Sequence, residues 1–260
     1  MLRITEVVKH LLIINVLMFI ASNVINIDML ALHYPASDKF QPYQIVTHFF
    51  MHANLAHLFF NMFALWMFGS ALEQFWGPRR FLFFYFFCAF GAAVLHLGWS
   101  YYEFSDLQGL IDAFQANPTY DTFWAFFNET PLPGIADNQQ IFQELSNGVR
   151  NDNQAAIARS LEEMSSFLDR RMDVPIVGAS GAIYGLLLAF GMYFPNTELM
   201  LIFLPIPIKA KYFIPILMVV ELFLGVNQFS WDNIAHFAHL GGALSGFLLI
   251  MYWRKVQGRY

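Results

Sequence analysis

The sequence has few charged residues. Only 13% of its 260 residues are Asp, Glu, Lys or Arg, whereas a soluble domain usually carries about 25%. Hydrophobic residues make up 57%, with 30 Phe among them, and the mean hydropathy is +0.47. This composition excludes an ordinary soluble domain and indicates an integral membrane protein that crosses the bilayer several times.

Cysteine and two common catalytic motifs are scarce or missing as well. Cys88 is the single cysteine, which excludes an internal disulfide framework and Cys-rich metal sites. The zinc-protease pattern His-Glu-x-x-His is absent. No Gly-x-Ser-x-Gly follows a predicted strand, as it does in an α/β-hydrolase.

Six apolar runs approach the roughly 20 residues that cross a bilayer. They fall at residues 7–27, 55–75, 81–98, 178–194, 212–224 and 236–253. Residues 99–173 are polar, with helical periodicity in two places, and we interpret them as an amphipathic insertion lying on the membrane surface. An aromatic cluster at 123–127 is expected to anchor it. The predicted fold is therefore all-α, a six-transmembrane-helix bundle that occupies 1–260 as one domain.

The basic residues gather on one side of this topology. With six crossings, both termini and the loops at 76–80 and 195–211 share a side. That side carries nine of the 14 basic residues, namely Arg3, Lys9, Arg79, Arg80, Lys209, Lys211, Arg254, Lys255 and Arg259. The positive-inside rule makes this side cytoplasmic. We therefore expect a multi-pass cell (inner) membrane protein whose fourth span begins on the outer side.

The fourth span opens with a serine among small residues, Gly178-Ala179-Ser180-Gly181. Tyr184 follows one turn later and shares a helix face with Ser180. Taken alone, such a motif more often marks close helix packing than chemistry. Its meaning depends on which polar groups meet the serine.

The sixth span offers a base for this serine. His239 lies near its outer end, and Gly242 and Gly246 follow on the same face, so this helix can pack tightly on the glycines of the fourth span. Neutral histidine is the usual base that activates a serine hydroxyl. His236 lies on nearly the same face, and depth in the membrane favours His239. No carboxylate occurs near the serine or His239 on these two helices, so the pattern predicts a Ser–His dyad, with Tyr184 packed on the imidazole.

The second span offers hydrogen-bond donors. His57 and Asn61 lie one turn apart on one face. Together with the backbone N–H of Ser180 they are expected to stabilise an oxyanion. His52 and His236 are expected to line a water path from the outer side, and residues 225–230 to cap the site.

These motifs together resemble the rhomboid family of intramembrane serine proteases. The matching patterns are Gly178-x-Ser180-Gly181 with Tyr184, Ala238-His239-x-x-Gly242 with Gly246, and His57-x-x-x-Asn61. The resemblance covers all six spans in order. It implies that Ser180 is the nucleophile, His239 the general base, and His57 and Asn61 the oxyanion stabilisers. It further implies cleavage of single-pass transmembrane proteins near their outer boundary, with no metal or other cofactor.

The resemblance also identifies Glu73 as a structural glutamate. Two features depart from the family pattern. Tyr43-Gln44 stands where many members have Trp-Arg, and the 99–173 insertion is longer than the usual connection.

Two other functions stay open. A transporter or channel for a metal ion or protons is suggested by the spacing of His48 with His52 and of His236 with His239, although we see no Asp, Glu or Cys that joins these histidines in the spans. An inactive rhomboid-like binding protein is the other, and the presence of both Ser180 and His239 disfavours it. The lipid bilayer and transmembrane substrates are the expected partners, and no nucleic acid is expected.

Overall fold

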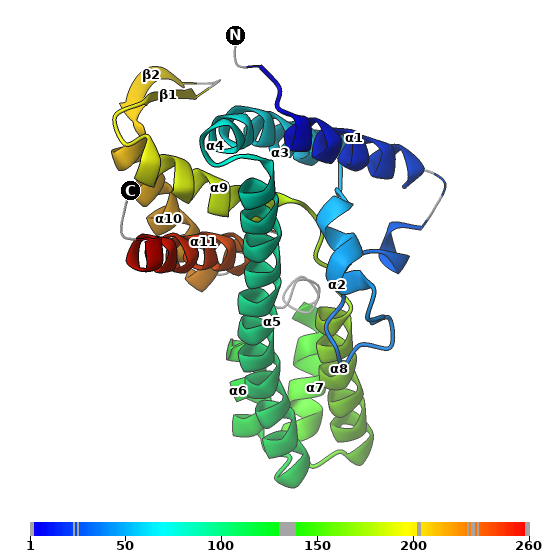
Figure 1. The fold of residues 1–260 in the computed structure, drawn as a ribbon. Coiled ribbons are helices and arrows are strands. Elements are labelled where there is room, and N and C mark those ends of the chain that lie inside the picture. The colour runs from blue at the N-terminus through cyan, green and yellow to red at the C-terminus, as the bar shows by residue number, and fades with distance from the viewer. Residues whose placement is uncertain are drawn as a thin grey trace.

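The computed structural model describes residues 3–22, 24, 26–129, 139–201, 204–227, 229, 232 and 234–257. Most of them are helical (Figure 1). The α-helices are α1 (Glu6–Ala21), α2 (Gln44–Thr47), α3 (Leu55–Ala64), α4 (Ser70–Trp76), α5 (Pro78–Ala116), α6 (Tyr120–Glu129), α7 (Gln139–Arg150), α8 (Gln154–Met172), α9 (Ser180–Tyr193), α10 (Ala210–Asn227) and α11 (His236–Gln257). Short turns are η1 (Ile27–Met29), η2 (His48–Phe50) and the π-helical η3 (Leu65–Gly69), and the strands are β1 (Glu198–Leu201) and β2 (Leu204–Lys209).

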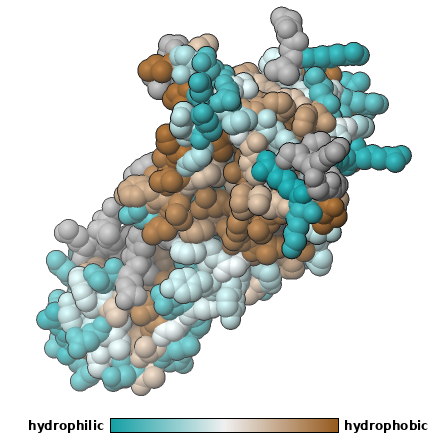
Figure 2. All heavy atoms as spheres, turned by 60° about the vertical axis from the view of Figure 1, so that its left-hand side comes forward, coloured by the Kyte–Doolittle hydropathy of each residue, from teal (hydrophilic) through white to brown (hydrophobic). Residues whose placement is uncertain are grey.

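Helices occur at all six places where the hydropathy predicts a span. By length and composition, three of the described helices are able to cross a membrane: Leu55–Trp76, Pro78–Ala116 and Ala210–Asn227. Helix Ser180–Tyr193 is also apolar but shorter. Apolar side chains gather over the middle of the molecule, while the lower end, where α6 to α8 lie, is hydrophilic (Figure 2). The helical class is confirmed, and the count of six crossings stays a prediction.

Glycines bring α9 and α11 into backbone contact at the centre of the fold. A Cβ atom built on Gly242 would lie 1.8 Å from the carbonyl oxygen of Gly181. One on Gly246 would lie 3.3 Å from the Cα atom of Gly185. These two helices therefore pack through their glycine faces, as the spacing predicts, and only glycine fits at Gly242.

The third predicted span does not end near residue 98. Helix α5 continues for 39 residues to Ala116, because a fall in hydropathy marks the end of apolar surroundings but does not stop a helix, and no proline follows Pro78 before residue 118. Its distal half packs with α6, α7 and α8 around a core of their own. Phe123 and Phe126 are fully buried in that core, so the prediction of an aromatic membrane anchor at 123–127 is wrong for these two residues. How the insertion lies against a membrane stays a prediction.

A β-hairpin precedes α10, where the sequence predicts a loop at 195–211. Strands β1 and β2 are antiparallel, with Glu198 opposite Lys209 and Leu199 opposite Ile208. Pro205 and Pro207 lie in β2. A two-stranded sheet tolerates them because each strand has an outer edge that needs no N–H donor. Proline is rare in strands, so the sequence did not indicate a strand here.

Glu73 joins α4 to the start of α1. Its buried carboxylate accepts the backbone N–H groups of Val7 (3.0 Å) and Val8 (2.9 Å) and the hydroxyl of Thr5. The two N–H groups are donors that the first turn of a helix leaves unpaired, and negative charge is favourable there. Glu73 therefore caps the N-terminus of α1 and has no contact with Ser180 among those described.

Candidate active site

Ser180 is the first residue of α9, and the chain reaches it through a turn that only glycine allows. Gly178 has φ +116°, and a Cβ atom there would lie 2.9 Å from the His57 ring. Ala179 then acts as N-cap of the helix. The backbone N–H groups of a first turn lack partners within the helix and form its positive end. The turn therefore presents the hydroxyl beside unpaired donors.

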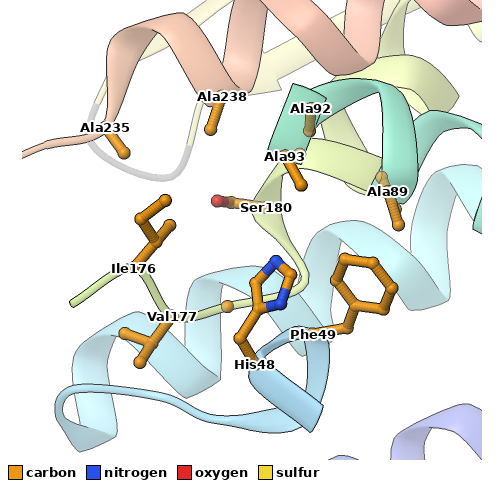
Figure 3. Close-up of a pocket in the computed structure, with 13 residues that line it drawn as sticks. His48, Phe49, Ala89, Ala92, Ala93, Ile176, Val177, Ser180, Ala235 and Ala238 are labelled. Carbon is orange, nitrogen blue, oxygen red and sulfur yellow. The ribbon is translucent and has the colours of Figure 1, made fainter. Parts of the chain in front are cut away.

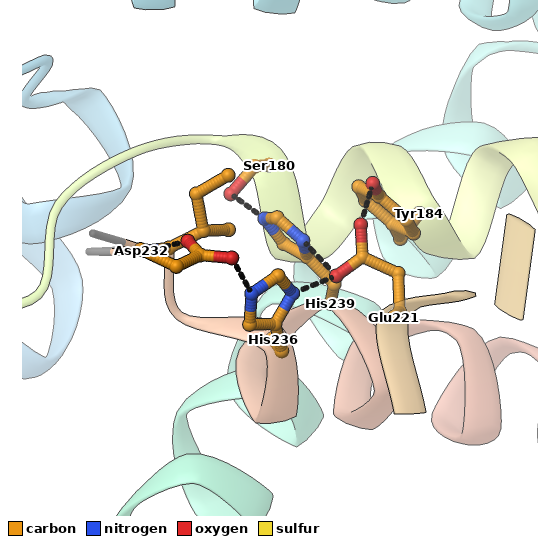
Figure 4. A network of polar contacts seen from close by, with 7 residues as sticks. Ser180, Tyr184, Glu221, Asp232, His236 and His239 are labelled. Carbon is orange, nitrogen blue, oxygen red and sulfur yellow. Dashed lines mark hydrogen bonds and ion pairs between the residues drawn. The ribbon is translucent and has the colours of Figure 1, made fainter. Parts of the chain in front are cut away.

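His239 of α11 meets this hydroxyl. Its Nε2 atom lies 3.0 Å from Ser180 Oγ. The Tyr184 ring stacks on the imidazole, with the ring centroids 4.0 Å apart and the planes 7° from parallel. The structure thus brings together the serine, the histidine and the tyrosine that sequence spacing placed on two facing helices (Figure 4).

A carboxylate from a third helix completes the surroundings of His239. Glu221 of α10 places Oε2 3.0 Å from His239 Nδ1 and 2.6 Å from His236 Nδ1. Its other oxygen accepts the Tyr184 hydroxyl. The expectation that no acidic residue joins the histidines in the spans is therefore wrong. The two helices that carry Ser180 and His239 have no carboxylate near these residues, whereas a lone acidic residue in the apolar run of α10 was the available signal.

His236 shares the Oε2 atom of Glu221 with His239. It is buried, and its Nε2 atom lies 2.9 Å from Asp232 Oδ2. Both of its ring nitrogens therefore face carboxylates, while His239 alone of the two reaches the serine. Ligand atoms of Glu221, His236 and His239 all lie within 4.8 Å of one another, a group that a metal ion could also use.

Helix α3 holds two donors beside the turn. Asn54 caps the helix by accepting the His57 backbone N–H at 2.8 Å. Asn61 Nδ2 lies 3.6 Å from the position a Cβ atom would take on Gly178. This nitrogen is buried and has no hydrogen-bond partner within the described part of the chain. An unpaired buried donor is unfavourable by about 1–3 kcal/mol, so an incoming oxygen would satisfy it.

His52 lies behind His57, with ring centroids 5.1 Å apart. Burial, with a smaller effect of His57, lowers the pKa of His52 to about 4. Its side chain is almost fully buried. At neutral pH it is therefore an uncharged ring that supports His57.

A hollow opens next to Ser180 (Figure 3). About 340 Å³ of space free of protein atoms lies in and just outside this hollow, part of it open solvent. Small and apolar side chains form most of its wall: Phe49, Ala89, Ala92, Ala93, Ile176, Val177, Ala182, Ala235 and Ala238, with His48 as the polar member besides the serine. The Ser180 hydroxyl points toward the space near Ile176 and Ala238. The predicted water-path residues His52 and His236 are not part of this wall as far as the described residues show.

The predicted cap falls partly outside the described residues, which lack 228 and 230. Gly225 itself lies inside α10, where a Cβ atom would come 2.9 Å from His236 Cβ. At this position the glycine permits close packing of α10 on α11.

Comparison with known proteins adds a family to this geometry. The family model described as Rhomboid domain matches residues 39–107 and 155–256, well over half of the chain. The chain belongs to the rhomboid family. An uncharacterized rhomboid protein of Schizosaccharomyces pombe, named as mitochondrial, is 27% identical over 219 residues, which cover 81% of this chain and 51% of that protein. This rhomboid chain thus spans about half the length of the curated relative it matches.

The first loop of this rhomboid is organised by Gln44, which stands where many family members have arginine. Its buried side chain hydrogen-bonds backbone groups of His33, Lys39 and Gln41. Its backbone carbonyl lies 2.6 Å from His48 Nδ1, and the His48 carbonyl accepts the Gly178 N–H at 2.9 Å. Burial lowers the pKa of His48 to about 4, so the ring is neutral. The side-chain amide of Gln44 thus holds the backbone of the loop, and its backbone carbonyl connects the loop through His48 to the serine turn.

Proposed function

We propose that this rhomboid is an intramembrane serine endopeptidase. The observation that carries the proposal is the 3.0 Å separation between Ser180 Oγ and His239 Nε2, a distance at which a general base takes a proton. The histidine and serine stand on apolar helices of a chain that belongs to a protease family. Inactive members of such families lack the serine or the histidine, and this chain has both.

The reaction follows from these positions. Ser180 gives its proton to His239 Nε2 as Oγ bonds to the carbonyl carbon of the substrate. His57, Asn61 and the Ser180 backbone N–H hold the resulting oxyanion. The C–N bond then breaks, and His239 delivers the proton to the leaving amine. A water molecule hydrolyses the acyl-enzyme by the same steps, with His239 again as base.

The substrate proposed is a single-pass transmembrane protein. An extended segment is needed to reach Ser180, so a substrate helix must unwind near its end. The distribution of basic residues supports a cytoplasmic location of both termini and a site that faces the outer side of the cell membrane. Apolar helices and the family support the membrane location.

The proposal is tested by reconstituting the purified protein in liposomes and measuring cleavage of a panel of single-span reporter proteins. Cleavage near one membrane boundary that disappears in Ser180→Ala and in His239→Ala supports the proposal. Labelling by a fluorophosphonate should disappear in the same two variants. A folded wild type that neither cleaves a reporter nor reacts with the probe indicates an inactive binding protein.

Metal or proton handling is the second candidate, and the cluster of Glu221, His236 and His239 is the observation that favours it. The same reporters separate the two functions. Cleavage that survives chelators supports the serine protease, whereas loss of activity on chelation and its return with a divalent cation supports a metal function.

A further inference from the structure

We propose that Glu221 is a positioning residue for His239, so that the catalytic group is a Ser–His–Glu triad assembled from α9, α11 and α10. The inference rests on the proposed protease function and deepens it. It replaces the dyad that the two motif-bearing helices suggest.

The contacts define which nitrogen of His239 carries the proton. A neutral imidazole has one N–H donor and one acceptor nitrogen. Glu221 Oε2 lies 3.0 Å from Nδ1, and Ser180 Oγ lies 3.0 Å from Nε2. Because an ionised carboxylate only accepts, the proton belongs on Nδ1. Nε2 is then left with the lone pair that removes the serine proton, whereas the other tautomer would present an N–H to the serine.

The surroundings of Glu221 fit the ionised form. One oxygen faces the Nδ1 atoms of His236 and His239, and the other accepts the Tyr184 hydroxyl. Three polar groups that can donate thus converge on the carboxylate. Glu221 is only 6% exposed, so water does not replace these donors.

Tyr184 holds both the base and the carboxylate. Its ring lies flat against the imidazole while its hydroxyl donates to Glu221. The imidazole is therefore fixed by a stack on its face and by hydrogen bonds at both edges (Figure 4). A ring held in this way meets the requirement for catalysis that reacting groups stay within a fraction of an ångström of their working positions.

The charges around the base also suit proton transfer. The groups that face Glu221 are Tyr184 on α9, and His236 and His239 on α11, with Asp232 beyond His236. The Glu221 carboxylate carries one negative charge and lies against both imidazoles. The proton that His239 takes from the serine neutralises that charge. A buried ion pair of this kind stabilises the imidazolium of the transition state.

Glu221→Gln is the decisive variant, because it keeps the shape of the side chain and removes the charge. We expect kcat on a transmembrane reporter to fall about 10²- to 10⁴-fold, since loss of the orienting carboxylate in serine-protease triads lowers kcat about 10⁴-fold and the Tyr184 stack remains here. KM should stay within about twofold, because Glu221 does not touch the proposed substrate path. The rate of fluorophosphonate labelling should fall in parallel.

Glu73→Gln is the matched control. Glu73 is another buried glutamate on an apolar helix, and its contacts are with the start of α1. We expect this variant to lower the midpoint of thermal unfolding and to leave kcat per folded molecule unchanged. Glu221→Asp keeps the charge but draws it back by about one C–C bond, so its kcat should lie between those of wild type and Glu221→Gln, at unchanged KM.

A kcat of Glu221→Gln within threefold of wild type overturns the triad. Should that variant fail to fold, Glu221→Asp decides, because a wild-type kcat there means that the position of the carboxylate is irrelevant. Absence of Ser180-dependent cleavage in the wild type is a separate outcome, which overturns the proposed protease function itself.

Discussion

Gly242→Ala tests whether the glycine contact between α9 and α11 sets the distance between Ser180 and His239, the proposed nucleophile and base. The added Cβ atom would lie 1.8 Å from the Gly181 carbonyl oxygen, a backbone atom that cannot rotate away. Ordinary non-bonded contacts begin near 3.4 Å, so the two helices must part by about 1.5 Å to restore a normal separation.

The displacement falls beside the site. Gly181 follows Ser180 directly, and Gly242 is one turn from His239. A shift of that size lengthens the 3.0 Å contact between Ser180 and His239 to roughly 4.5 Å, beyond hydrogen-bond reach. A 1 Å misplacement can lower a rate about 10²-fold, so we expect kcat/KM to fall at least that far. Overpacking should also destabilise the fold by about 1–3 kcal/mol.

Reporter cleavage and thermal unfolding in the same detergent measure the two effects. Gly98→Ala is the control, because a Cβ atom on this helical glycine of α5 meets nothing within 4 Å. It should leave kcat/KM unchanged and stabilise the protein by about 0.5–1 kcal/mol. Wild-type activity and stability in Gly242→Ala would refute the reasoning.

Three further predictions concern the oxyanion donor, the buried histidines and the first loop. Asn61→Ala should lower kcat about 10²- to 10³-fold with little change in KM, because it removes a donor that acts in the transition state; a raised KM at constant kcat would contradict this. His48 and His52 have pKa values of about 4 in the fold and about 6.5 when unfolded, so the unfolded state binds more protons between these values. Stability should hold above pH 6.5 and fall between pH 6.5 and 4, by at most about 1.4 kcal/mol per pH unit for each histidine; His48→Gln should flatten the dependence of the unfolding midpoint on pH, and an equal slope would count against the assignment. Gln44→Ala should lower the free energy of unfolding by about 1–3 kcal/mol, because it leaves buried backbone groups unpaired; an unchanged unfolding midpoint would show that the loop does not depend on this amide.

The parts of the site that lie on one helix, or on two helices with complementary faces, could be predicted from spacing. Ser180 and Tyr184 share a face because they are four residues apart, and glycines at 181 and 242 specify which faces meet. His239 follows, since its distance from Gly242 along the helix fixes its depth. Periodicity carries this information because helix geometry is regular.

Glu221 could not be placed in the same way. A single carboxylate in an apolar run has no periodic partner, and its orientation depends on how α10 rotates against α9 and α11. The continuation of α5 and the burial of Phe123 and Phe126 could not be predicted from the sequence for a related reason. Hydropathy reports which surroundings a residue prefers, and a soluble helical core is as apolar as an interface.

Helix α5 runs without a break from the candidate active site into the insertion, so it couples the two mechanically. Ala92 lies against Gly181 at the catalytic end, and Phe114 lies in the core of the insertion, about 33 Å away at 1.5 Å per residue. One continuous helix joins them, so a force that tilts the bundle of α6, α7 and α8 also moves the wall beside Ser180.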